Sequence, residues 1–147
     1  MKKTGISLFF IFLLFTAFSQ TVDKKVIQAP DAPKAIGPYS QAILAGNTLY
    51  VSGNIALDPE TGKMDTLNLE TETRRVMSNL GAVLKEAGMS YDNIVKATIY
   101  MTDIKNYKQI NAIYGEYFKA LPPAREAIQV VALPAGAHVE VSCVAVK

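Results

Sequence analysis

Two helical stripes of apolar residues stand out along the chain. From Leu69 the apolar positions recur every three or four residues, which predicts a helix that ends at Gly88. Its inner face would consist of Leu69, Thr73, Val76, Leu80, Leu84 and Ala87. A second stripe follows Asp103, spans about Tyr107 to Ala120 and stops at Pro122 and Pro123; it consists of Ile110, Ile113, Tyr114, Tyr117 and Phe118. The chain therefore contains two amphipathic helices that each bury one face.

Alternating apolar and polar residues predict the strands. Residues 94–101 alternate, and one side would carry Val95, Ala97, Ile99 and Met101. Gly46-Asn47 separates two short apolar runs and indicates a hairpin, while residues 58–62 indicate another turn. Further strands are expected near Val26-Ile27, at about 125–133 and at about 139–146. The order of elements predicts an α+β sandwich, a mixed sheet with two helices on one face.

Side-chain parity predicts what the two faces of this sheet carry. We assign Ile128 and Val130 to the face under the helices, because both are apolar. The other face would collect Ser52, Lys96, Thr98, Tyr100, Arg125, Gln129, Glu140 and Ser142, together with Ala127, Val131 and Val144. Two helices cannot cover both faces, and the apolar residues on the second face favour contact with other subunits over contact with water.

The first 19 residues have the pattern of a signal peptide. Lys2 and Lys3 precede an apolar run from Ile6 to Phe15, and Ala17-Phe18-Ser19 offers small residues for cleavage before Gln20. The run is shorter than the roughly 20 residues that a membrane-spanning helix needs. We therefore expect residues 1–19 to be removed, residues 20–147 to form a single domain, and the protein to be exported to a periplasm or the extracellular space without remaining in the membrane.

Composition argues against several classes of ligand. The chain has 15 Lys and Arg against 13 Asp and Glu, and loss of Lys2 and Lys3 leaves 13 of each, so that the mature net charge is zero. The mature sequence has no stripe of basic residues that would indicate a nucleic-acid partner. The single cysteine, Cys143, cannot form an intrachain disulfide and lies in an apolar strand, as a buried, inert thiol would. The single histidine, His138, is expected in an exposed loop, and one His with one Cys does not predict a metal site.

Arg125 and Glu140 are the candidates for chemistry. Arg125 stands at the mouth of an apolar-rich strand, and Glu140 is the one carboxylate of the last strand. A guanidinium grips a carboxylate through two parallel hydrogen bonds, and a nearby carboxylate can move protons. The pair suggests a site for a small carboxylic acid. A structural Arg–Glu pair at a sheet edge explains the same residues equally well.

Several short segments resemble the reactive-intermediate deaminases, the RidA (YjgF) family. The resemblance covers about residues 25–146 and lies in the order and spacing of six motifs. These are Ala35-Ile36-Gly37-Pro38-Tyr39-Ser40-Gln41-Ala42, Val51-Ser52-Gly53, Asn93-Ile94-Val95-Lys96, Asn111 with Tyr114, Pro123-Ala124-Arg125 and Val139-Glu140-Val141.

The resemblance implies a fold, an assembly and a reaction. It implies a chorismate-mutase-like subunit in a homotrimer with a central barrel and sites between subunits. It also implies hydrolysis of 2-imino or 2-enamino acids to 2-oxo acids and ammonia, without a cofactor or metal. Arg125 would bind the substrate carboxylate and Glu140 would activate water. The pocket would be lined by Tyr39, Ser52, Gly53, Asn111 and Ala127.

The chain departs from the family pattern at four positions. Ala127 stands where many members have a cysteine, and Glu126 where a small residue is usual. Glu72 replaces a common glutamine, and Ser142 an acid. These departures keep open a non-catalytic trimer that binds small molecules. Endoribonuclease or chaperone-like activity, also linked to the family, fits a neutral mature chain less well.

Overall fold

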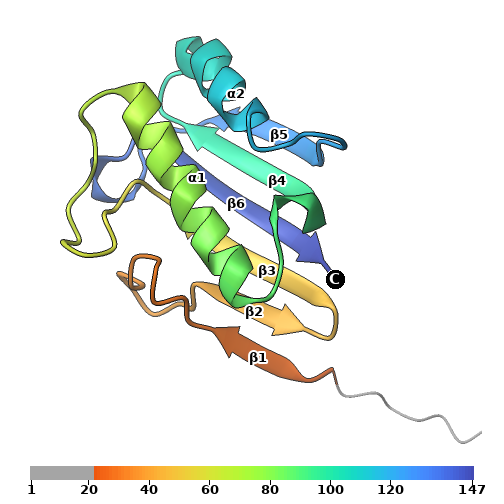
Figure 1. Cartoon of the computed structure of the whole chain (residues 1–147). Helices are drawn as coiled ribbons and strands as arrows, with labels where there is room; N and C mark the ends of the chain where they lie inside the picture. The colour runs from red at the N-terminus through yellow and green to blue at the C-terminus, as the bar shows by residue number, and fades with distance from the viewer. Residues whose placement is uncertain (1–21) are drawn as a thin grey trace, which may run out of the picture.

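The computed structural model describes residues 22–147, which form one six-stranded sheet with two helices (Figure 1). The predicted signal peptide, residues 1–19, lies outside the described residues. The sheet has the order β1-β2-β3-β6-β4-β5, and only β4 and β5 run parallel. The strands are β1 Lys24–Ile27, β2 Ala42–Ala45, β3 Thr48–Asn54, β4 Ile94–Met101, β5 Ala124–Gln129 and β6 Val139–Val146. The predicted mixed sheet is confirmed.

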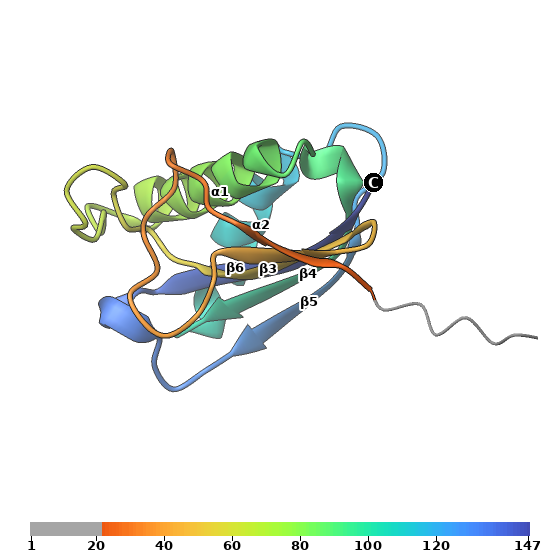
Figure 2. The same cartoon turned by 90° about the horizontal axis from the view of Figure 1, so that it is seen from below.

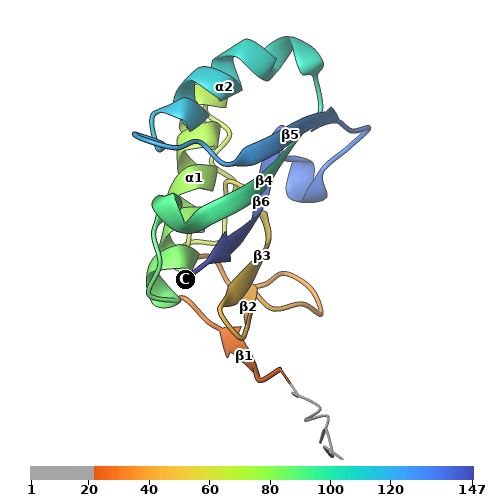
Figure 3. The ribbon, with the colours of Figure 1, turned by 90° about the vertical axis from the view of Figure 1, so that its right-hand side faces the viewer.

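Both helices, α1 Leu69–Glu86 and α2 Tyr107–Gly115, pack on the same face of the sheet (Figure 2). The opposite face carries no helix in the described part of the chain, and β1 and β5 form its two edges (Figure 3). This is the predicted α+β arrangement. Among residues 22–147, neither helix has the length and apolar character that a membrane crossing requires.

The ends of α1 follow from its sequence. The side chain of Asn68 accepts a hydrogen bond from the Thr71 N–H and so caps the first turn. Gly88 ends the helix in the left-handed conformation, with φ +70°, which costs glycine little. Between these caps the face toward the sheet is fully buried and includes Val76, Met77, Leu80, Val83 and Leu84. The predicted helix is confirmed, and its burial anchors the sheet that carries the candidate residues.

One predicted alternation and two predicted element ends were wrong. The strand alternation was misplaced at its start, because a bulge between Ile94 and Lys96 leaves Val95 exposed and puts Ile94 in the core. The second helix ends at Gly115, although Tyr117 and Phe118 still pack against the core from the turns that follow. The strand that begins near Arg125 ends at Gln129.

The predicted face of Arg125 was also wrong. In the parallel pair of β4 and β5, Arg125 lies opposite Ala97 and Ala127 opposite Ile99, and both partners are buried beneath the helices. Arg125, Ala127 and, by the same alternation, Gln129 therefore face the helix side. Ile128 lies on the open side and is 42% exposed. Parity fixes only which residues of a strand share a face; the register with β4 decides which face that is.

The remaining polar residues lie on the open face as predicted. Tyr100 pairs with Glu140 and Thr98 with Ser142, on the side opposite the buried Ile99. Ser52, which follows the buried Val51, belongs to the same face. Exposed apolar residues, among them Tyr50 and Ile128, accompany them.

Candidate active site

Arg125 is held in place by neutral groups of α2. Its Nη1 donates a hydrogen bond to Asn111 Oδ1 at 2.6 Å, and its Nη2 donates to the Tyr107 hydroxyl at 3.0 Å. The guanidinium carbon lies 5.0 Å from the centre of the Tyr114 ring, within reach of a cation–π attraction. No ion pair joins Arg125 to a carboxylate within residues 22–147. Its orientation is therefore fixed while its charge remains available to an anion.

A depression of about 480 Å³ opens beside this guanidinium. Its walls are mainly apolar and aromatic, and include Asn111, Tyr114, Phe118, Pro122 and Pro123. Apolar walls around one oriented charge are typical of sites for small molecules. Tyr114 is buried, its hydroxyl has no hydrogen-bond partner among the described residues, and burial raises its pKa to about 12, so that it stays protonated at neutral pH.

Glu140 lies in a different pocket, on the open face of the sheet. It shares a space of about 270 Å³ with Ile36, Tyr39, Ser52, Gly53, Ile55 and Pro134. The carboxylate is half-buried, and this burial raises the pKa of Glu140 above its ordinary value. In the described part of the chain no side-chain hydrogen bond and no ion pair involves it, so its oxygens are available to a substrate or a water.

Gly53 leaves the space that the Glu140 carboxylate fills. A Cβ atom on residue 53 would overlap that carboxylate, so that any larger residue would displace one of the two. Close approach of a side chain to the backbone is a reason for glycine in a strand. Gly53 therefore leaves the carboxylate room to lie against the backbone of β3.

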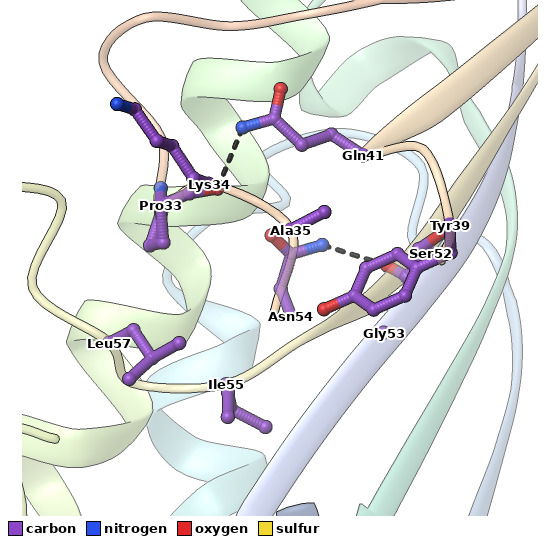
Figure 4. A pocket seen from close by; sticks show the side chains of 10 residues that line it. All are labelled: Pro33, Lys34, Ala35, Tyr39, Gln41, Ser52, Gly53, Asn54, Ile55 and Leu57. Carbon is purple, nitrogen blue, oxygen red and sulfur yellow. Dashed lines mark hydrogen bonds between the residues drawn. The ribbon is translucent and has the colours of Figure 1, made fainter. Parts of the chain in front are cut away.

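The loop before β2 brings Tyr39 to the same pocket. Gln41 holds the loop by accepting from the Ala29 N–H and donating to the Pro33 carbonyl, and Ser52 donates to the Ser40 carbonyl at 2.7 Å. Figure 4 shows the Tyr39 ring lying over Ser52 and Gly53 at the end of β3. The predicted group of Tyr39, Ser52, Gly53 and Glu140 is thus brought together.

Arg125 and Glu140 do not meet within one chain. Arg125 and Asn111 lie on the helix side at the β5 edge, whereas Glu140 lies on the open side of β6, beyond β4. The structural Arg–Glu pair considered from the sequence is therefore not formed within the described chain. The candidate residues instead form two half-sites: the cationic half-site, with Arg125, Asn111, Tyr107 and Tyr114, and the carboxylate half-site, with Glu140, Tyr39, Ser52 and Gly53.

Ala127 and Glu126, the two residues near Arg125 that depart from the family pattern, have different surroundings. Ala127 faces the helix side and packs against the core, and it is absent from the walls of the Arg125 depression. Glu126 lies on the open face, where its carboxylate is 2.7 Å from Lys96 Nζ and accepts from the Thr98 hydroxyl. The hydrogen bond from Lys96 lowers the pKa of Glu126. Glu126 therefore does not compete for Arg125 within the chain.

Sequence reasoning missed Tyr107 and Tyr114 as neighbours of Arg125, because it placed Tyr114 in the apolar stripe of the second helix and Tyr107 at the start of that helix. Tyr107, Asn111 and Tyr114 lie four and three residues apart and so share one face of α2. That spacing beside a conspicuous arginine was an available signal. By contrast, Cys143 is buried as predicted, and burial raises the pKa of its thiol to about 12, so that it is unreactive at neutral pH. Within residues 22–147 no three His, Cys, Asp or Glu side chains cluster as metal ligands would.

Three comparisons place this geometry among known proteins. A model of the family described as endoribonuclease L-PSP matches residues 29–147. The 2-iminobutanoate/2-iminopropanoate deaminase of Homo sapiens is 43% identical over 124 residues, which cover 84% of this chain and 90% of the human protein. A crystal structure of a Rid-family protein from Yersinia pestis is 48% identical, with a TM-score of 0.83, and covers 85% of this chain and 100% of its own. The structure of E. coli TdcF with bound serine is 33% identical, with a TM-score of 0.80, and covers 84% of this chain and 98% of the TdcF chain.

Proposed function

Because the chain belongs to the endoribonuclease L-PSP family, which includes the Rid deaminases, we propose that it hydrolyses 2-imino acids to 2-oxo acids and ammonia. The observation that carries the proposal is Arg125, a guanidinium oriented by neutral groups and free of any carboxylate in the described chain. A 2-imino acid supplies the missing carboxylate next to its reactive carbon. The human relative is named for this activity.

The division into two half-sites supports a shared site between subunits. We propose a homotrimer in which the cationic half-site of one subunit faces the carboxylate half-site of the next. The open sheet face, with exposed Tyr50 and Ile128, has the apolar character that a subunit contact needs. Closed three-fold symmetry would create three equal sites from these two surfaces.

The reaction needs a carboxylate anchor, a placed water and a proton carrier. Arg125 holds the substrate carboxylate, which fixes the imine carbon relative to Glu140. Glu140 takes a proton from water as the oxygen bonds to the imine carbon, and the C=N π electrons move to nitrogen. Glu140 then returns the proton to that nitrogen, which gives a carbinolamine, and next takes the proton of the new hydroxyl group and passes it to the nitrogen. The C–N bond breaks as the C=O bond forms, ammonia leaves, and Glu140 is again ionised. Because burial raises the pKa of Glu140, its carboxylate is a stronger base than an ordinary glutamate.

A trimer that binds small molecules without turning them over is the second candidate. E. coli TdcF holds a bound serine in its structure, and serine has a carboxylate but no imine. The same Arg125 could hold such a ligand. Ammonia and 2-oxobutanoate release from freshly generated 2-iminobutanoate separates the two functions, and RNA added in a parallel reaction tests for cleavage by the same preparation.

Mixed trimers test the shared site directly. Arg125→Ala and Glu140→Gln should each be inactive alone. Co-refolding equal amounts should restore about a quarter of wild-type turnover, because random mixing leaves about one interface in four with both intact halves. A mixture as inactive as its parents would contradict a site built from two subunits.

We also propose that the protein is exported after loss of residues 1–19. The support is the sequence pattern of Lys2, Lys3 and the apolar run that follows them. N-terminal sequencing of the protein secreted from its native host tests this, with a start at Gln20 expected. An intact Met1 in a cytosolic fraction would contradict it.

A further inference from the structure

Glu72 is a buried carboxylate that the proposed reaction does not use. It lies in the first turn of α1 and is 1% exposed. Burial of an ionised carboxylate is costly unless donors surround its oxygens. The groups that donate hydrogen bonds to the Glu72 carboxylate therefore show which part of the chain this side chain holds in place.

All three donors come from the two residues at the entrance to β6. Glu72 Oε1 accepts from the His138 N–H at 2.6 Å and from the Val139 N–H at 3.3 Å. Its Oε2 lies 2.8 Å from His138 Nδ1. One side chain of α1 thus clasps two successive peptide groups and an imidazole, a contact that we call the Glu72 clasp.

The clasped junction directly precedes Glu140. The loop that leads into it contains two residues in the left-handed conformation, Ala135 with φ +55° and Gly136 with φ +72°, and its Pro134 lines the Glu140 pocket. On its other side the junction is held by the Thr102 N–H, which donates to the His138 carbonyl. The Glu72 clasp therefore sets the point from which β6 carries Glu140 and Pro134 into the pocket.

The position of the Glu140 carboxylate matters for its proposed role in proton transfer. The carboxylate already touches the backbone at Gly53, where a Cβ atom would overlap it. A shift of about 1 Å at a reacting group can cost about 100-fold in rate. The clasp on one side and Gly53 on the other constrain the same carboxylate.

We propose that Glu72 is a positioning residue, which holds the entrance of β6 so that Glu140 meets its water and substrate in a reactive geometry. This inference rests on the proposed role of Glu140 in imine hydrolysis. Glu72 touches neither pocket and acts only through His138 and Val139.

The chemistry of the clasp predicts which replacements work. A carboxylate accepts from both peptide N–H groups and requires a proton on His138 Nδ1. A glutamine can keep the two peptide contacts through its oxygen and turn its NH₂ toward Nδ1 of the other imidazole tautomer. Alanine leaves the peptide N–H groups of His138 and Val139 without their acceptor, and aspartate is one methylene too short to reach all three donors.

Kinetics and a titration on matched variants test the proposal. Glu72→Ala should lower kcat for 2-iminobutanoate by about 10–100-fold with little change in KM, and Glu72→Gln should restore most of it. The ¹³C signal of the Glu140 carboxyl carbon, assigned by Glu140→Gln, should titrate at a different pH in Glu72→Ala. Tyr39 lines the same pocket and Tyr100 pairs with Glu140 across β4, so these two tyrosines are the titratable neighbours to be distinguished from Glu140 in the titration. Thr73→Val, which removes a buried hydroxyl bonded only within α1, should behave as wild type.

The outcomes separate positioning from mere stability. If Glu72→Ala does not fold, Glu72→Asp keeps the charge and should show the same loss of kcat and the same altered titration. Unchanged kcat and unchanged Glu140 titration in the folded variants, even with a lower melting temperature, would overturn the proposal. A wild-type protein that releases no ammonia from imines would instead refute the proposed reaction, and the Glu140 titration would still decide whether the clasp positions that carboxylate.

Discussion

The two half-sites treat their charged groups in opposite ways. The Arg125 guanidinium is tied to Asn111 and Tyr107 and stacks near Tyr114, so that it is oriented before any ligand arrives. The Glu140 carboxylate has no side-chain hydrogen bond or ion pair in the described chain and lies against the backbone at Gly53, in space that a Cβ atom would fill. A group that anchors a ligand gains from fixed orientation, whereas a group that exchanges protons must keep its oxygens accessible.

Arg74 shows what an arginine with an ordinary structural role looks like in the same chain. Its guanidinium bonds to Glu70 and bidentately to Glu116, and these exposed pairs join α1 to the end of α2. Both carboxylates compensate its charge, in contrast to Arg125. Arg74 is therefore the natural control for substitutions at the cationic half-site.

The largest expected effect is at Glu140. Glu140→Gln should lower kcat by about 10²–10⁴-fold, because the amide can hydrogen-bond a water but cannot take its proton. Binding of 2-oxobutanoate, measured by calorimetry, should survive. Burial raises the folded-state pKa of Glu140, so the ionised form opposes folding above that pKa, and the variant should melt no lower than wild type at pH 7. Loss of oligomer and of analogue binding would instead mark Glu140 as a structural residue.

The pH dependence of wild-type kcat also tests whether Glu140 is the general base. Glu140 must be ionised to act as a base, so activity should fall as the pH drops through its raised pKa. The acid limb should therefore lie above the pH at which an ordinary glutamate titrates. A limb at or below that ordinary value would mean that another group activates the water.

The second largest effect is expected when Arg125, the anchor of the substrate carboxylate, is replaced. Arg125→Ala should cost about 2–5 kcal/mol in kcat/KM, because the substrate carboxylate loses its paired donors. Arg125→Lys should recover only part of this, since an ammonium cannot form the two parallel bonds. Arg74→Ala should leave turnover unchanged and change stability by less than about 1 kcal/mol. Steady-state kinetics measure these effects, and circular dichroism checks that each variant is folded. Wild-type turnover in Arg125→Ala would refute the proposal that Arg125 anchors the substrate.

Gly53→Ala tests placement by shape. The added methyl group would overlap the Glu140 carboxylate, and its displacement should lower kcat by up to about 100-fold. If the effect acts through that carboxylate, Gly53→Ala combined with Glu140→Gln should lose no more activity than Glu140→Gln alone. Additive losses would mean that Gly53 serves the site in some other way.

The smallest expected effect concerns the orientation of Arg125. Tyr107→Phe removes one of its two hydrogen bonds, so the anchor should weaken by about 0.5–1.5 kcal/mol, seen as a higher KM with kcat nearly unchanged. Tyr117→Phe, in the turns just after the same helix, should change neither constant. An unaltered KM in Tyr107→Phe would show that Asn111 alone suffices to orient the guanidinium.

The sequence predicted what depends on local periodicity and missed what depends on register. The 3.6-residue stripe of α1 and the hairpin at Gly46 follow from neighbouring residues, and both were confirmed. The face of Arg125 depends on the pairing of β5 with β4, which no local pattern contains. The bulge at Val95 shifted an otherwise regular alternation for the same reason.

The candidate site was predicted as a set of residues but not as an arrangement. The motifs around Tyr39, Ser52, Gly53 and Glu140 led to one pocket, as expected. Arg125 and Asn111 lie in another pocket. Successive residues of a strand point to opposite faces of the sheet, so two strand residues such as Arg125 and Glu140 can belong to one sheet and still face opposite sides. Glu72 was noticed only as a departure from a family pattern, because its partners at His138 and Val139 are 66 and 67 residues away.

The burial of Cys143 has a consequence for the redox history of the protein. With its pKa raised to about 12, the thiol is almost never a thiolate at neutral pH, and the thiolate is the form that attacks disulfides and oxidants. As the only cysteine in the sequence, it also has no partner within its own chain. The one thiol of the chain thus stays a free thiol in reducing and oxidising surroundings alike, and passage between them would require neither an oxidase nor a disulfide isomerase.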